Sequence, residues 1–311
     1  MNFNTLPFYI ILVLGINFLL IPSVLLSQHI SQNPYLMVLG TVQDGGAPQI
    51  NCSRSCCLNL TRKESSQRKV TSVAVIQPKI NFTTLFEASP DIVSQWRLLP
   101  DQPDAIFLTH AHIGHYSGLI NLGKEALGAK SIPVYVMPKM KVFLTENAPW
   151  SQLVSLKNIK LIELLNFRKT HGLGNIEVVP IIVPHRDEFS ETVGYQILGP
   201  NKSVLFIPDI DKWSKWDEDL GEILKTVDFA FIDATFFDSS EINYRPIEEI
   251  PHPLVKETIE QLSIYSKKIK DKVYFIHMNH TNPMLDPDSE ASKWVLKQGF
   301  NIARLGQKFS L

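Results

Sequence analysis

Three of the nine histidines in this 311-residue chain fall within six positions, as His110, His112 and His115 in the segment LTHAHIGHYSGL. Neutral imidazole binds zinc, iron and similar ions, and a cluster of imidazoles with an open coordination position can activate water. A single histidine is more often a packed or solvated side chain. The concentration of three of them in one short segment instead predicts a metal site.

The segment AIFLTH (105–110) has the composition of a strand that ends at this cluster. Residues two apart in an extended chain point the same way, so His110 and His112 can address one point in space. His115 falls at the start of a helix expected over 115–127 and can face a neighbouring point. The spacing therefore allows two adjacent metal positions.

The motif THAHIGH resembles the HxHxDH signature of the metallo-β-lactamase superfamily, whose fold is an α+β, four-layered αββα sandwich. Further landmarks of that family occur in the same order, each after an expected strand: His185 in VPHRDEF, Asp209 in LFIPDID and His277 in VYFIHMNH. The resemblance implies that His110, His112 and His185 hold one metal ion. It also implies a second ion at His115 and His277, with Asp209 between the two.

A closer resemblance, over about residues 36–311, is to the branch of the superfamily that contains the pyrroloquinoline quinone biosynthesis protein B. It depends on the segments GTVQDGGAPQINCSRSCC, FEASPDI, PHRDEFSETVGY and FIHMNHTNPML. This branch resemblance implies that the cysteine-rich loop holds a structural zinc ion, as in related phosphodiesterases of the superfamily.

All three cysteines of the chain, Cys52, Cys56 and Cys57, lie in that one loop. Exported domains usually pair their cysteines, but an odd number so close together is poorly placed for disulfides. Zinc ligation explains the clustering better, and inert loop thiols are the alternative. His280, three residues after His277, is the candidate for the fourth zinc ligand.

The sequence departs from the family signature at Gly114, where the superfamily has an aspartate between the second and third histidines. Glycine has no donor atom, so the second site is expected to lose an anionic ligand and to bind its metal weakly. We therefore expect one tightly bound ion, held by three imidazoles and Asp209. On this reasoning, a Gly114→Asp substitution would strengthen the second site.

These residues predict a metal-dependent hydrolase that acts on a small-molecule ester, lactone, amide or phosphodiester. Asp209 would hold the attacking water and accept its proton. Zinc is the expected ion, and iron or manganese are also compatible with these ligands. Asp233, at the end of the strand expected over 229–235, could orient a histidine or cap a turn. His252, between two prolines, is assigned no role.

Two other functions remain open. The first is an iron-dependent oxygenase at the same ligands, which the resemblance to the quinone biosynthesis branch allows. The second is a non-catalytic binding protein in which metals only stabilise the fold. The five histidines disfavour the second, because a structural staple needs no open coordination position.

The elements expected to position these residues form one domain of mixed sheets flanked by helices, over residues 33–311. Strands are expected at 35–41, 70–76, 83–88, 105–110, 133–137, 176–183, 192–198, 203–209, 229–235 and 272–278. Helices are expected at 115–127, 138–146, 215–226, 253–270 and 289–298.

Composition and the N-terminus restrict the partners and the location. A net charge of −1, with 44% hydrophobic and 20% charged residues, gives no electrostatic reason to expect nucleic acid as a partner. Residues 7–26, PFYIILVLGINFLLIPSVLL, are apolar and uncharged, and small residues follow near Ser27. Residues 1–28 are therefore expected to be a cleaved signal peptide or an uncleaved membrane anchor, with a buried helix as the alternative. An exported domain, periplasmic or secreted, follows from either of the first two.

Overall fold

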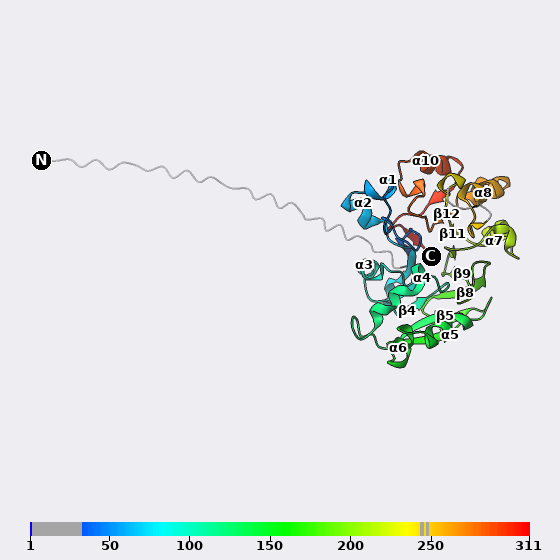
Figure 1. Ribbon diagram of the computed structural model, residues 1–311. Coiled ribbons are helices and arrows are strands. Elements are labelled where there is room, and N and C mark those ends of the chain that lie inside the picture. The colour runs from blue at the N-terminus through cyan, green and yellow to red at the C-terminus, as the bar shows by residue number, and fades with distance from the viewer. Residues whose placement is uncertain (2–32, 243–245, 247–248) are drawn as a thin grey trace. The chain divides into compact units, whose positions relative to one another are not determined.

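The structure is a computed structural model that describes Met1, residues 33–242, Pro246 and residues 249–311 (Figure 1). The leader expected over residues 1–28 lies outside the described residues, apart from Met1. Within the described part of the chain, no helix is long and apolar enough to span a membrane.

From residue 33 onward the chain forms two seven-stranded mixed sheets. The first has the strand order β14-β1-β2-β3-β4-β5-β6, with bounds β1 (Tyr35–Gly40), β2 (Ser72–Gln77), β3 (Phe82–Phe86), β4 (Ala105–Phe107), β5 (Ile132–Val136), β6 (Ile159–Glu163) and β14 (Lys308–Ser310). The second has the order β13-β12-β11-β10-β9-β8-β7, with bounds β7 (Thr170–Leu173), β8 (Ile176–Ile182), β9 (Val193–Leu198), β10 (Ser203–Ile207), β11 (Phe229–Asp233), β12 (Val273–Ile276) and β13 (Asn301–Ile302).

Helices cover the outer face of each sheet (Figure 1). Those packed on the first sheet are α3 (Ile92–Trp96), α5 (Pro138–Glu146) and α6 (Trp150–Ser155). Those packed on the second are α7 (Leu220–Thr226), α8 (Val255–Gln261) and α10 (Glu290–Lys297). The shorter helices are α1 (Ser55–Leu58), α2 (Arg62–Gln67), α4 (Ile113–Tyr116) and α9 (Lys267–Lys270).

Three apolar cores separate the four layers. Successive side chains of a strand point to opposite faces, so Val73 and Val75 of β2 enter the core between the sheets while Ala74 and Ile76 face the helices. Aromatic rings from both sheets meet in the central core, where Phe107 packs edge-on against Tyr195 with ring centroids 5.4 Å apart. The predicted αββα sandwich is confirmed.

The predicted strands all occur, with ends shifted by a few residues, but two predicted helices are wrong in extent. In place of a helix over 115–127, α4 ends at Tyr116 and a 3-10 helix covers Ser117–Leu122. The N–H of Gly118 donates to the carbonyl of Ala88 and not to a helical partner. The segment 253–270 is divided into α8 and α9, which a 3-10 turn at Leu262–Ile264 separates.

Candidate metal centre

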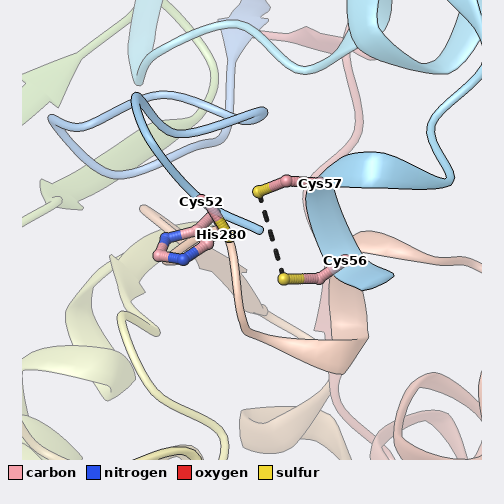
Figure 2. Close-up of side chains that lie close together, drawn as sticks. All are labelled: Cys52, Cys56, Cys57 and His280. Carbon is pink, nitrogen blue, oxygen red and sulfur yellow. Dashed lines mark hydrogen bonds between the residues drawn. The ribbon is translucent and has the colours of Figure 1, made fainter. Parts of the chain in front are cut away.

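The cysteine loop forms a compact cluster with a distant histidine (Figure 2). The three thiols of Cys52, Cys56 and Cys57 and one ring nitrogen of His280 all lie within 4.8 Å of one another. The Cys56 and Cys57 sulfurs are 4.0 Å apart, close to the roughly 3.8 Å expected for two thiolates on one tetrahedral zinc. All three cysteines are free of disulfides. The structure thus brings together the predicted zinc ligands, and their metal binding stays a prediction.

The second cluster lies where strands of both sheets end. Strands β10, β11 and β12 are parallel, and β8 runs in the same direction because β9 is antiparallel to both β8 and β10. In the first sheet, β1 and β4 also run in the same direction, because β2 is antiparallel to both β1 and β3, and β3 is parallel to β4. The segments that follow these strands carry the polar side chains of the centre: Asp44, His110, His112, His185, Asp209, Asp233 and His277.

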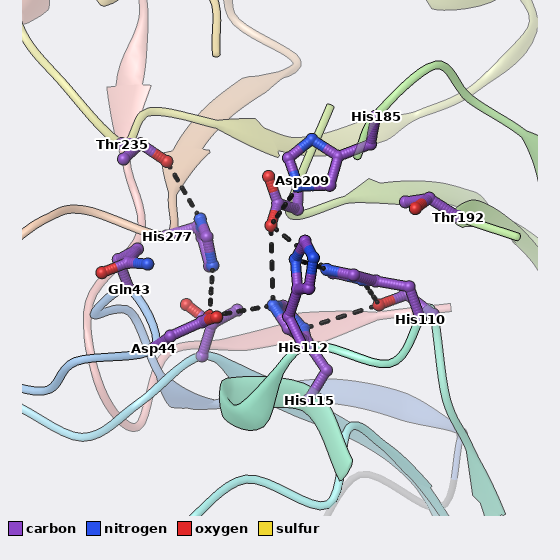
Figure 3. A network of polar contacts seen from close by, with 12 residues as sticks. Gln43, Asp44, His110, His112, His115, His185, Thr192, Asp209, Thr235 and His277 are labelled. Carbon is purple, nitrogen blue, oxygen red and sulfur yellow. Dashed lines mark hydrogen bonds and ion pairs between the residues drawn. The ribbon is translucent and has the colours of Figure 1, made fainter. Parts of the chain in front are cut away.

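Four of these side chains converge on one point (Figure 3). Asp209 Oδ2 lies 3.3 Å from His110 Nε2 and 3.3 Å from His185 Nε2, and His110 Nε2 lies 2.8 Å from His112 Nδ1. Two nitrogen or oxygen ligands of a tetrahedral zinc ion stand about 3.3 Å apart. The spacing of the donor atoms in this group of four, His110, His112, His185 and Asp209, therefore fits a divalent metal. These are the residues that the family resemblance implied.

The protonation of this group also fits a metal. Burial lowers the pKa of His110 well below its usual value and the pKa of His185 to about 4, so both imidazoles are neutral, as metal ligands must be. Burial alone would raise the pKa of Asp209, but the neighbouring histidines, His185 foremost, hold it well below the usual range. His110 and His185 thus present neutral nitrogens beside one carboxylate.

Several of these atoms have no hydrogen-bond partner. In the described part of the chain, both ring nitrogens of His185, Nδ1 and Nε2, are buried and make no hydrogen bond. Buried polar atoms are nearly always paired, because an unpaired one costs about 1–3 kcal/mol. A shared cation would satisfy such atoms, so their lack of partners supports a metal at the centre.

The remaining two histidines form a second group with a residue that the sequence analysis missed. Asp44 Oδ1 lies 3.1 Å from His115 Nε2 and 3.3 Å from His277 Nε2. A carboxylate from another loop therefore lies beside His115 and His277 although residue 114 is glycine, and the weak metal binding expected there stays a prediction. Asp209 Oδ2, 3.8 Å from His115 Nε2, lies between the two groups.

Hydrogen bonds on the far side of the rings hold the histidines in place. Thr109 Oγ1 is 2.9 Å from His110 Nδ1, and Thr235 Oγ1 is 3.1 Å from His277 Nδ1. The buried carboxylate of Glu87 lies 3.5 Å from Nδ1 of His115. Such contacts fix the tautomer and the direction of a ligating imidazole.

His252, which was assigned no role from the sequence, is buried beside the centre. Its Nδ1 is 2.8 Å from Asp233 Oδ2 and 3.1 Å from Asp209 Oδ1. Burial alone would lower the pKa of His252, but the two carboxylates outweigh it and raise the pKa to about 10. Asp233 also accepts hydrogen bonds from the backbone of Ile210 and Thr235, so it both orients a histidine and fixes a turn.

An Asp233→Asn substitution is expected to reduce kcat by about 10- to 100-fold, the usual effect of losing a group that orients a ligand or its neighbour. Because Asp233 is not in the group of four, the metal content should be unchanged, and KM should change little. Steady-state kinetics with metal analysis check this, with Asp228→Asn at the distant start of β11 as the control. A parallel fall in metal content and melting temperature would show a purely structural role instead.

Comparisons with known proteins agree with this geometry. Residues 83–278 match the family model described as beta-lactamase superfamily domain. Coenzyme PQQ synthesis protein B of Rhizobium meliloti is 27% identical over 310 residues, which cover 89% of this chain and 97% of that protein. The crystal structure of Zn(2+)-bound PqqB from Methylobacterium extorquens has a TM-score of 0.75 and 22% identity, over 89% of this chain and 100% of the other. A diphosphatase from the PhnP family has a TM-score of 0.66 and 22% identity, over 90% of this chain and 97% of the other.

Proposed function

The chain belongs to the beta-lactamase superfamily, and from that premise we propose that it is a metal-dependent hydrolase of a small anionic ester. The observation that carries the proposal is the convergence of four donor atoms, from His110, His112, His185 and Asp209, within 4.8 Å of one another. A zinc or similar ion bound there supplies Lewis acidity, which lowers the pKa of water and polarises a substrate oxygen.

The residues around the centre support hydrolysis. The carboxylate of Asp209 is fixed from one side by His252, 3.1 Å from Oδ1, so its position for holding an attacking water is set before substrate binds. Nδ1 of His252 contacts the carboxylates of Asp209 and Asp233, and the side chain also lines a cavity of about 400 Å³. From that place His252 is positioned to donate a proton to the leaving group of a substrate in the cavity.

The same cavity favours a phosphodiester among the four classes of substrate. Arg54, from the cysteine loop, and Arg186, next to His185, both line it. Guanidinium groups recognise phosphate oxygens with paired, charge-assisted hydrogen bonds. Glu241 and Glu249 line the cavity too, but burial raises the pKa of Glu241, and its carboxylate accepts hydrogen bonds from Phe237 N and Thr281 Oγ1.

The test is hydrolysis by protein loaded with zinc or manganese, measured on a chromogenic phosphodiester, a phosphomonoester and a lactone. We expect the diester to be cleaved fastest. Replacing Arg186 by glutamine should raise KM for the diester about 10-fold, because a hydrogen bond to a charged group contributes about 1.5–3 kcal/mol. Metal content should not change.

An Arg62→Gln variant is the control, since Arg62 is exposed on α2 and does not line the cavity. Preferential cleavage of the lactone, with no effect of Arg186→Gln, would contradict the anionic substrate. Iron in the purified protein, with oxygen consumption and no hydrolysis, would overturn the hydrolase and favour the oxygenase.

A further inference from the structure

Gly114 and Asp44 compete for one volume. A Cβ atom added at Gly114 would lie 2.6 Å from the carboxyl carbon of Asp44 and 2.7 Å from its Cα. Rotation of the Asp44 side chain cannot relieve the second contact, because it involves the backbone. A side chain at position 114 therefore meets both the Asp44 carboxylate and the backbone of the loop that carries it.

The backbone around Asp44 holds the carboxylate at this place. The loop after β1 is bonded to the segment after β12, since Gln43 N donates to Met278 O at 2.9 Å and Met278 N donates to Thr41 O at 2.8 Å. These bonds join the neighbours of Asp44 to the neighbour of His277. The Asp44 side chain is only 12% exposed, so it is a fixed part of the centre and not a solvated loop residue.

The surroundings of the carboxylate suit a cation. Oδ1 of Asp44 lies 3.1 Å from the buried His115 Nε2, with which it forms an ion pair. An oxygen and a nitrogen at this separation also match two ligands of one ion, which stand about 3.3 Å apart, as in the first group. His277 adds a further nitrogen, 3.3 Å from the same oxygen.

We propose that Asp44 is the carboxylate ligand of a second metal ion at His115 and His277, supplied by the loop after β1 in place of an aspartate at position 114. This proposal rests on the proposed function only in that the centre binds metal. It reverses the expected effect of Gly114→Asp. That substitution places a side chain against both the carboxylate and the backbone of Asp44, and so weakens the second site.

The experiment is a swap of the two residues in the full chain. Bound Mn²⁺ is counted by equilibrium dialysis and elemental analysis, because manganese suits sites with carboxylate ligands while the thiolates of the cysteine cluster select zinc. Electron paramagnetic resonance then separates a coupled pair of ions from a single ion. The wild type is expected to bind two Mn²⁺ ions as a coupled pair.

Asp44→Gly and Gly114→Asp should each leave one tightly bound Mn²⁺ ion. The affinity for the second ion should fall more than about 100-fold, which exceeds the effect of losing a residue that only orients a metal ligand. The double variant Asp44→Gly/Gly114→Asp should also lose the second ion, because the Cα of residue 44 still lies 2.7 Å from the new Cβ atom. Asp44→Asn, which keeps the shape of the side chain, repeats the test if the glycine variant folds poorly. Asp101→Asn, at an exposed carboxylate, is the control.

Two coupled ions retained in both Asp44→Gly and Asp44→Asn would overturn the assignment of Asp44 while leaving the hydrolase proposal intact. A wild type that binds no Mn²⁺ would overturn both. A wild type with one tight ion, unaffected by Asp44→Gly, would overturn the second site alone.

Discussion

Replacement of His185 by alanine is expected to remove the metal held by the group of four and to lower hydrolysis by more than about 100-fold, beyond the loss that follows removal of an outer contact. His185 supplies a neutral nitrogen 3.3 Å from Asp209 Oδ2 and follows the end of β8. Because the side chain belongs to a loop at the end of the sheets and not to any of the three cores, the sandwich should stay folded. Elemental analysis, diester hydrolysis and circular dichroism measure the three effects.

His171→Ala is the matched control, since His171 is a histidine with an exposed side chain on β7 that contacts Glu177. It should leave metal content and activity unchanged. Full metal content in His185→Ala would show that the four donor atoms do not share an ion. Retained hydrolysis in metal-depleted His185→Ala would separate the activity from this centre.

The ligand histidines could be predicted because each follows a strand with a strong pattern. The runs before His110, His185 and His277 are apolar and contain β-branched residues, so their ends were predictable within a few residues. The strands that the sequence did not reveal are β6, β7, β13 and β14. Strands β7 and β14 lie at sheet edges and β13 has two residues, so their extended form depends on a neighbouring strand more than on their own composition.

Asp44 could not be found by inspecting the histidine motif, because the residue that fills the place of the missing aspartate is distant in sequence. A signal was nevertheless present. Once Cys52, Cys56 and Cys57 are paired with His280, the loop that carries Asp44 must lie beside the segment that carries His277. The sequence shows a missing ligand readily, but only the packing of two loops shows its replacement.

His252 was missed for a different reason. It lies between Pro251 and Pro253, and nothing in the local pattern indicates burial. In the structure the segment enters α8, and the ring reaches Asp209 and Asp233. Its contacts come entirely from other strands, so its role depended on tertiary structure.

The cysteine cluster connects to the same two loops as the second metal group. Asp44 and the three cysteines belong to one connection between β1 and β2, while His277 and His280 belong to one connection after β12. An ion at the cysteines would therefore join the two segments that supply Asp44 and His277. The ion would add to the backbone hydrogen bonds that already join these segments, from Gln43 to Met278 and from Met278 to Thr41.

A Cys56→Ser substitution is expected to release the zinc of the cysteine cluster and to lower the melting temperature by about 8 °C or more. Loss of a bound metal is among the changes that cost about 4 kcal/mol, and each kcal/mol shifts Tm by about 2–4 °C in a domain of this size. Because the same loop carries Asp44, the second Mn²⁺ ion should bind more weakly, while the ion at His185 is retained. Differential scanning calorimetry and metal analysis check both effects, with Ser55→Ala in the same short helix as the control. Unchanged zinc content and Tm in Cys56→Ser would show that the thiols are inert, whereas a lower Tm with normal Mn²⁺ binding would show that the backbone bonds alone place Asp44.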